Sequence, residues 1–205
     1  MMEQAFSSTL TNTPLDLQIT ICIFLHPSDI LALRKVCPMS SINIESFGCL
    51  LRHIKTCKAL ELATRKRIVW VTVLHRVCLD NTLFLPSFPI PDMSDLELER
   101  AAIAPRRWIG ALQKQHSESN DFSEMLLHTR RSRTINDANK LQFFIVPGGR
   151  YLVTAGKGLS VWDLGYVSTV DCKLVASIEF GDYFEFFAVQ PTPDGKGLII
   201  LSSYK

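Results

Sequence analysis

The sequence contains no apolar run approaching the roughly 18 residues that a membrane-spanning helix needs. It also lacks a secretory signal. The apolar stretch ITICIFL follows Glu3 and Asp16 with no Lys or Arg before it, and no small-residue cleavage site comes after it. No Asn-x-Ser/Thr acceptor is present. We therefore expect a protein of the cytoplasm or nucleus without membrane contact, in which the six cysteines stay free thiols.

A dominant charge of one sign is also missing. Lys and Arg total 22 against 20 Asp and Glu, so the formal net charge is only +2. Such a balance creates no overall field that attracts nucleic acid or acidic lipid. The basic clusters at 65–67 and 130–133 are short and lack several interleaved aromatic residues. We expect them to be solvated surface, and we expect no nucleic-acid partner.

No motif of a known catalytic or phosphate site is present. There is no G-x-S-x-G, no G-x-G-x-x-G after a strand, and Gly156-Lys157 lacks the other residues of a P-loop. Cys49, His53 and Cys57 recur at four-residue spacing, but without a paired C-x-x-C this is not a known structural zinc pattern. The sequence therefore predicts a protein that is not an enzyme and holds no cofactor or metal.

What the sequence does contain is a short apolar segment near its N-terminus. Thr13 is suited to cap a helix, Pro14 to its first position, and Asp16 to the positive end of its dipole. Leu17, Ile21 and further apolar residues follow at helical spacing, on more than one side of the helix. A helix that is apolar on several sides is covered on several sides. In so short a helix, the second cover could be another chain.

A second helix follows directly. His26-Pro27 ends the first helix, Ser28 and Asp29 can open the next, and Ile30, Leu31 and Leu33 supply its apolar face. The order Pro-x-Asp-Leu and then Pro-x-Asp-Ile resembles an F-box. With TCKAL at 56–60 and RIVW at 67–70, the segment is similar to fungal F-box proteins that carry a β-propeller-like C-terminal half.

This resemblance implies a substrate-recognition subunit of a Skp–cullin–F-box ubiquitin ligase. The N-terminal helices would bind the Skp-type adaptor protein, and the C-terminal β region would bind a protein substrate that the sequence does not identify. Ubiquitin transfer would take place on other subunits, so this chain needs no catalytic residue. The residues expected to contact the adaptor are Pro14, Leu15, Leu17, Ile21, Leu25, Pro27, Ile30, Leu31 and Leu33.

The segment departs from the family pattern in two places. Thr13 stands where the family usually has Leu, and the block 36–55 separates LALRK from TCKAL. Without this block the two pieces join into a smooth third helix of an F-box. The block is either a retained short intron or a genuine loop–helix insertion, and sequencing the transcript across the junction decides between them.

The middle of the chain is expected to be mostly helical. Residues 64–80 continue as a helix with Trp70 as a core anchor, whereas the three prolines of NTLFLPSFPIP exclude an α-helix at 81–91. Ser94 then begins a helix with Glu97 at the capping-box position, and Pro105 starts another that holds Trp108 as a second core anchor. We assign 81–115 to a helical and proline-rich extension and 116–140 to a linker.

From Leu141 the pattern changes to strands. Six short β-branched or aromatic segments alternate with glycine turns: LQFFIV, RYLVTA, LSVWDL, KLVASIEF, YFEFFAVQ and GLIILSS. The segment ending in Trp162-Asp163 resembles a WD-type propeller repeat, and the next repeat is incomplete, so we expect a truncated propeller.

The expected fold class is α+β. A flexible arm at 1–12 precedes an all-α F-box-like domain at 13–80, and an incomplete antiparallel β-propeller-like region occupies 141–205. Two alternatives to a ligase adaptor remain at this stage: a propeller-type protein-binding scaffold without a ligase role, and a non-functional truncated gene product. Retention of a Skp-type adaptor separates the first of these from the F-box hypothesis.

Overall fold

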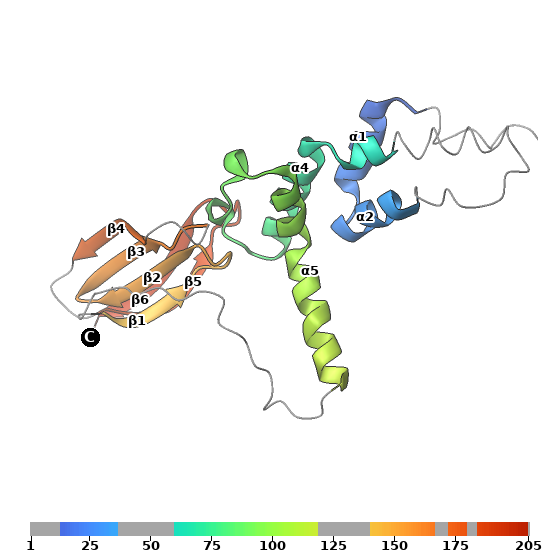
Figure 1. Ribbon diagram of the computed structural model, residues 1–205. Helices are drawn as coiled ribbons and strands as arrows, with labels where there is room; N and C mark the ends of the chain where they lie inside the picture. The colour runs from blue at the N-terminus through green and yellow to red at the C-terminus, as the bar shows by residue number, and fades with distance from the viewer. Residues whose placement is uncertain (1–12, 37–59, 119–139, 167–171, 180–183, 205) are drawn as a thin grey trace, which may run out of the picture. The chain divides into compact units, whose positions relative to one another are not determined.

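The computed structural model describes residues 13–36, 60–118, 140–166, 172–179 and 184–204. Helices come first and antiparallel strands follow, which confirms the α+β class (Figure 1). The arm, Cys49, His53, Cys57 and the block after Val36 lie outside these ranges, as does most of the 116–140 linker. No helix within the described ranges is both long and apolar enough to cross a membrane.

The chain forms two compact units. One consists of residues up to Leu74 together with Ser94–Arg107, and the other of His75–Met93 together with Trp108–Lys205. The described helices are α1 (Leu15–Phe24), α2 (Pro27–Val36), α4 (Arg67–Asp80) and α5 (Asp95–Glu118), with two 3-10 turns, η1 (Leu85–Ser87) and η2 (Ile90–Asp92). Helices α4 and α5 therefore each contribute residues to both units.

The start of α1 differs from the expected cap. Pro14, rather than Thr13, is the N-cap residue, and it makes no side-chain cap hydrogen bond. Its carbonyl oxygen accepts the amides of Leu17 and Gln18 at 3.0 and 3.2 Å. The Gln18 side chain reaches back to Thr13, donating to its carbonyl oxygen at 3.2 Å. Thr13 therefore anchors the entry of the chain through Gln18, because Pro14 already occupies the cap.

The predicted helix at 64–80 is interrupted at its beginning. Residues 60–64 are helical, the helix breaks at 65–66, and α4 then begins at Arg67. Trp70 is almost fully buried, which confirms it as a core anchor, whereas Ile68 is 55% exposed. The residues that fill the core from α4 share one broad face: Val69, Trp70, Val73, Leu74, Val77 and Cys78.

Helix α5 begins as the sequence predicts and then continues further. The Ser94 amide and hydroxyl both donate to Glu97 Oε2, at 2.8 and 2.7 Å, and this confirms the capping box. These bonds, led by the Ser94 amide, lower the pKa of the Glu97 carboxyl. The predicted break at Pro105 is wrong, because Pro105 lies inside one continuous helix. Proline removes one backbone donor, and the buried Leu98 and other apolar residues before it hold the helix in place.

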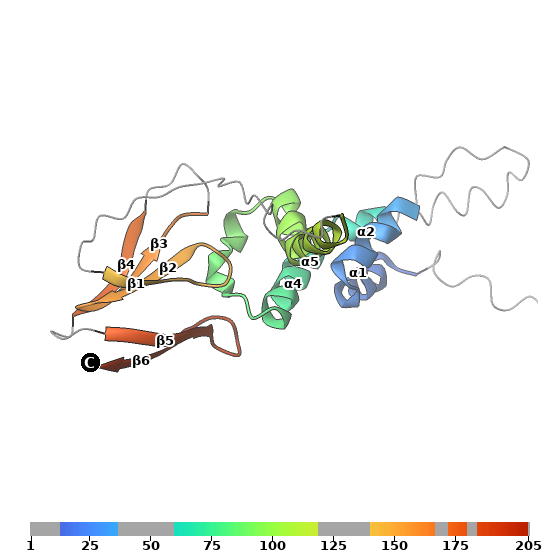
Figure 2. The same ribbon diagram turned by 90° about the horizontal axis from the view of Figure 1, so that it is seen from below.

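All six predicted strands are present. They are β1 (Lys140–Ile145), β2 (Tyr151–Gly156), β3 (Gly158–Asp163), β4 (Lys173–Glu179), β5 (Phe184–Pro191) and β6 (Leu198–Tyr204). The first four form an antiparallel sheet in the order β1-β2-β3-β4, and β5 pairs with β6 in a separate hairpin. Figure 2 shows this hairpin as a second layer against the four-stranded sheet, and β5 is the strand that contacts β1 and β2.

We call the four-stranded sheet together with the β5–β6 hairpin the β unit. Its core lies between these two layers. Val153 and Val146 are fully buried there, and Val189 of β5 and Phe84 join them. Partly buried side chains from both layers complete the core: Phe144, Tyr151, Leu159, Val161, Leu198 and Ile200. Since side chains alternate along a strand, each layer has this inner face and an opposite outer face.

The proline-rich segment after α4 is an integral part of this unit. The Phe84 amide donates to the Pro147 carbonyl and the Leu85 amide to the Gly195 carbonyl, each at 2.9 Å. The Phe84 ring meets Tyr151 edge to face at 5.5 Å. The segment therefore lies across the turns of both layers, as its apolar residues and lack of helix-forming pattern suggest.

One turn contact requires glycine. Gly148 has φ +112°, and a Cβ there would lie 2.5 Å from Ser87 Oγ, while Gly149 has φ +76° and open space around it. We expect Gly148→Ala to lower the free energy of unfolding by more than 2 kcal/mol, as an order-of-magnitude value for a disfavoured φ plus a clash. Gly149→Ala is the matched control and should cost about 1 kcal/mol. Urea unfolding measures both; equal costs would show that the Ser87 contact does not constrain the turn.

Candidate docking surface

An apolar row on α1 faces solvent. Leu17, Ile21 and Phe24 are 53%, 42% and 77% exposed, and their spacing of four and three residues places them on one side of the helix. Leu15 at the start of the helix is also exposed. We call Leu17, Ile21 and Phe24 the α1 row. Three large apolar side chains held in line on a short helix offer a surface that loses contact with water when another chain covers it.

A neighbouring side of α1 packs inward through two other residues. Cys22 is fully buried and Gln18 is 1% exposed. Burial raises the pKa of the Cys22 thiol, so this sulfur stays protonated and unreactive at neutral pH. The periodic pattern alone did not reveal this choice of face, because Ile19 and Ile23 make α1 apolar nearly all round.

The nine predicted contact residues divide between surface and interior. Pro14, Leu15, Leu17 and Ile21 are exposed. Leu25, Leu31 and Leu33 are half-buried, Pro27 is buried, and Ile30 is fully buried. Pro27 and Ile30 therefore support the fold and cannot reach a partner without unfolding α2. Phe24, the most exposed of the row, is not among the nine, although its place seven residues after Leu17 is a detectable signal.

Polar groups lie beside the turn between α1 and α2. His26 Nδ1 lies 2.9 Å from Ser28 Oγ, and the Arg106 guanidinium lies 3.1 Å from His26 Nδ1 and also donates to Ser28 Oγ. Arg106 comes from α5, so these contacts join the turn to a distant part of the chain.

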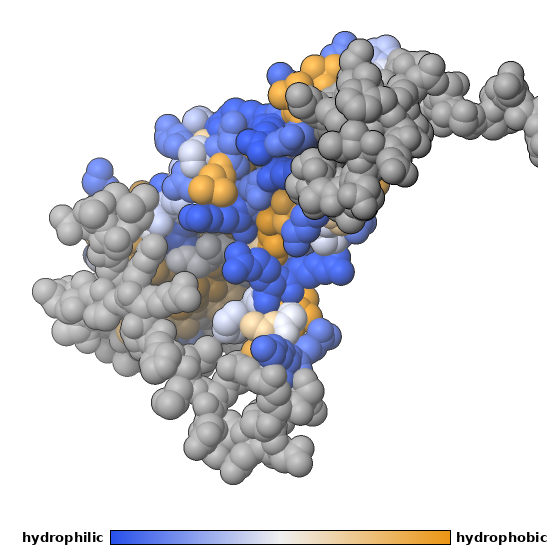
Figure 3. Space-filling view, turned by 45° about the vertical axis from the view of Figure 1, so that its right-hand side comes forward, coloured by the Kyte–Doolittle hydropathy of each residue, from blue (hydrophilic) through white to orange (hydrophobic). Residues whose placement is uncertain are grey.

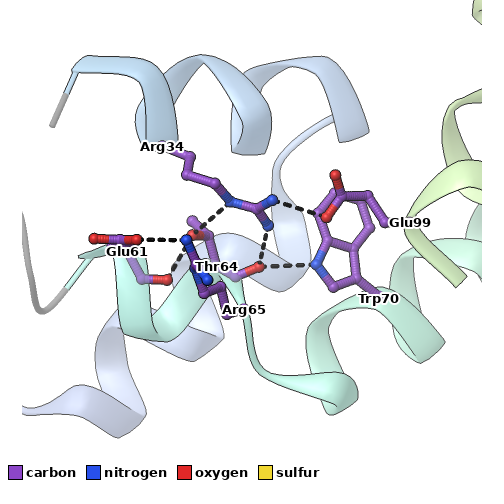
Figure 4. A network of polar contacts seen from close by, with 6 residues as sticks. All are labelled: Arg34, Glu61, Thr64, Arg65, Trp70 and Glu99. Atoms are coloured by element: carbon purple, nitrogen blue, oxygen red, sulfur yellow. Dashed lines mark hydrogen bonds and ion pairs between the residues drawn. The ribbon is translucent and has the colours of Figure 1, made fainter. Parts of the chain in front are cut away.

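A single arginine of α2 ties this helix to the rest of its unit (Figure 4). Arg34 Nη1 donates to Glu99 Oε2 at 2.8 Å, and Nη2 donates to the Thr64 carbonyl oxygen at 2.9 Å. The same carbonyl accepts Trp70 Nε1 at 2.8 Å, and the guanidinium lies over the indole ring with its Cζ atom 5.7 Å from the centroid. Four segments of the chain thus meet at one side chain.

The planar guanidinium explains why arginine stands here. It satisfies a carboxylate and a backbone carbonyl at the same time and still stacks on an aromatic ring, which a lysine ammonium does not do. The Arg34 and Glu99 side chains are only 22% and 18% exposed. Because water screens the pair incompletely, it stabilises the placement of α2 more than an exposed pair would.

We expect Arg34→Ala to lower the free energy of unfolding by about 2–3 kcal/mol, since Glu99 and the Thr64 carbonyl then lose a charged partner in a poorly hydrated site. Arg65→Ala is the matched control. Arg65 pairs with Glu61 at 2.6 Å, but its side chain is 64% exposed, so its loss should cost below about 0.5 kcal/mol. Urea unfolding of both variants measures the difference, and similar costs would contradict a structural role for Arg34.

The described residues include no group of three or more His, Cys, Asp or Glu side chains arranged to hold a metal ion. Hydrophobic residues on the face drawn in Figure 3 form separate patches within a largely hydrophilic surface. Comparison with protein-family models, with curated proteins and with solved structures finds no match to this chain. A functional argument therefore depends on the chain's own surfaces, of which the α1 row is the most regular.

Proposed function

We propose that this protein is a substrate-recognition subunit of a Skp–cullin–F-box ubiquitin ligase and that the α1 row binds the Skp-type adaptor. The observation that carries the proposal is the exposure of Leu17, Ile21 and Phe24 on a helix that is anchored on a neighbouring side by Gln18 and Cys22. A fixed helix with an outward apolar row fits the helix-packing mode of protein recognition.

The energetics favour a protein partner for this row. Burying one large apolar side chain contributes about 1.5–3 kcal/mol, so three aligned side chains suffice for a cluster of hot-spot contacts. The polar His26–Ser28 turn borders the row at its C-terminal end. An apolar centre with a polar rim is the usual composition of such interfaces.

The β unit supplies the substrate-binding part of the proposal. Its third strand, β3, ends in the Trp162-Asp163 pair, and the four antiparallel strands resemble one blade of a WD-type propeller with the β5–β6 hairpin as the start of the next. Every residue of β4 is exposed, so this edge strand has backbone groups available to pair with an extended peptide. We propose a protein substrate, with ubiquitin transfer carried out by other subunits in the cytoplasm or nucleus.

Co-expression with a Skp-type adaptor and a cullin tests the proposal. We expect the wild-type chain to retain the adaptor through affinity purification and gel filtration, and the cullin to follow only when the adaptor is present. A chain that folds, binds other proteins through its β unit and retains no adaptor would favour the scaffold without a ligase role. A chain that fails to fold would favour a non-functional gene product.

A further inference from the structure

The second half of helix α5 is exposed to solvent on every side. Residues 107–111 are all exposed, and five successive residues of a helix span more than one full turn. Trp108 and Ile109 are 54% and 51% exposed, although large apolar side chains are usually buried. We call residues 105–114 the distal α5 segment. Two large apolar side chains held next to each other in water indicate a surface that another molecule covers.

The first half of α5 holds this segment in place. Leu98 is fully buried, Ala102 is 3% exposed, and the Ser94–Glu97 capping box closes the N-terminal end of the helix. The distal α5 segment is therefore the helical continuation of a firmly packed base. A helix that is already formed loses little conformational entropy when it binds, which favours its use in recognition.

The apolar residues of the distal α5 segment have the spacing of a helix that inserts into a groove. Four of them share one side of the helix at positions i, i+3, i+4 and i+7: Pro105, Trp108, Ile109 and Leu112. Groove-binding helices use this set of positions as their anchors. Trp108 has the largest side chain of the four, and tryptophan is enriched among hot-spot residues. The apolar side thus indicates a protein groove with room for an indole ring.

The charged residues around these anchors are all of one sign. Residues 100–117 contain no Asp or Glu and four basic residues, in a chain whose net charge is only +2: Arg100, Arg106, Arg107 and Lys114. Arg106 donates to Ser28 Oγ, whereas Arg107 and Lys114 lie on the side of the helix away from the apolar anchors. A complementary partner therefore presents carboxylates beside its apolar groove.

The distribution of the two kinds of side chain favours a groove over a flat surface. A membrane contacts one side of a helix, so with Trp108 in lipid the Arg107 and Lys114 side would face away from anionic head groups. Nucleic acid would bind the basic side and leave the apolar anchors in water. A groove encloses the helix and contacts both sides at once, which accounts for all the exposed side chains of the segment.

We infer that the distal α5 segment binds in the groove of a calcium-loaded EF-hand sensor protein. Such sensors open an apolar, methionine-rich groove when they bind calcium, and a methionine lining adapts to a side chain as large as tryptophan. Their calcium-binding loops are rich in carboxylates, which matches the basic side of the segment. A basic amphipathic helix is a typical target of this class. The inference goes beyond adaptor binding and does not depend on it, because the α1 row takes no part.

Titration calorimetry of the full chain with calcium-loaded calmodulin tests the inference. We expect binding by the wild type and at least a roughly 100-fold loss of affinity in Trp108→Gln/Ile109→Gln, which removes two anchors. Arg107→Gln/Lys114→Gln should lose about tenfold and depend less on salt. Leu96→Gln is the matched control, because Leu96 is also 54% exposed and lies in the first half of the same helix. It should bind like the wild type, and circular dichroism verifies the folding of each variant.

The remaining outcomes separate this partner from the other candidates. A calcium chelator should abolish binding, because the groove of the sensor closes without calcium. A wild-type chain that does not bind calcium-loaded calmodulin would overturn the inference, and so would binding that survives in Trp108→Gln/Ile109→Gln. Without calmodulin binding, phosphatidylserine vesicles that bind the wild type and not this variant would assign the segment to a membrane surface. Duplex DNA that binds the wild type and not Arg107→Gln/Lys114→Gln would assign it to nucleic acid.

Discussion

The double variant Leu17→Asp/Phe24→Asp should lose at least about 100-fold in affinity for a Skp-type adaptor. Each substitution removes an apolar contact and would bring a carboxylate into an apolar interface, and costs of 2 kcal/mol or more are typical of such hot-spot positions. Both side chains are more than half exposed in the free chain, so the fold should persist. Isothermal titration with purified adaptor measures the affinity.

Leu96→Asp is the matched control for this experiment. Leu96 is 54% exposed, close to Leu17, but it lies on α5 rather than on the α1 row. We expect this variant to bind the adaptor like the wild type. Leu25→Asp is a poor choice for the test, because Leu25 is half-buried and its change would also disturb packing. Equal losses in the α1 variant and the Leu96 control would refute a specific role for the α1 row.

The second large effect concerns an ion pair in the β unit. Asp163→Ala should lower the local stability of this unit by about 3 kcal/mol. The Asp163 carboxylate accepts Arg150 Nε at 2.9 Å and Nη2 at 2.6 Å, and it also accepts the Gly165 amide at 2.8 Å. Arg150 donates further to the Pro86 carbonyl oxygen at 3.3 Å. Removing the carboxylate leaves a poorly hydrated guanidinium without its partner.

Hydrogen exchange of the β2 and β3 amides measures this local stability. Asp80→Ala is a suitable control, because it removes an exposed carboxylate at the C-terminal end of α4, where a negative charge gains nothing from the helix dipole. We expect the control to change the exchange of these amides by less than about 0.5 kcal/mol. Unchanged exchange in Asp163→Ala would mean that the pair does not stabilise the sheet.

The same pair predicts a dependence on pH. Bonding to Arg150, the largest cause, lowers the pKa of the Asp163 carboxyl. A carboxyl whose pKa is lower in the folded state contributes stability above its unfolded value of about 3.9, and this contribution is lost as the pH falls through the folded value. The difference in stability between the wild type and Asp163→Ala should therefore be constant near neutrality and shrink below about pH 4. If this difference in stability stays constant as the pH falls below about 4, the ion pair is not its source.

Local signals in the sequence predicted which segments form helices and strands better than they predicted which side of each helix is buried. The capping box of Ser94 and Glu97 and the six strands depend on neighbouring residues, and the structure confirms them. Trp108 shows the limit of such reasoning, because it is 54% exposed although its pattern predicted a core anchor. Burial depends on which other segments pack against a helix, and spacing along one helix does not contain that information.

The same limit applies to the prediction of the docking surface on α1. Leu17, Ile21 and Phe24 share a helical spacing that the sequence contains, whereas the burial of Ile30 follows from how α2 packs against its neighbours. The Arg34 site joins residues that are 30 and 65 positions apart, so no local motif predicts it.

Hydroxyl-radical footprinting of the chain with and without adaptor tests the central claim most directly. Phe24 is 77% exposed and Trp108 is 54% exposed, so both side chains should be oxidised readily in the free chain. On addition of a Skp-type adaptor at saturating concentration, the account predicts that oxidation of Phe24 falls several-fold while that of Trp108 stays unchanged. Unchanged oxidation of Phe24 in the presence of the adaptor would contradict the assignment of the α1 row as its binding surface.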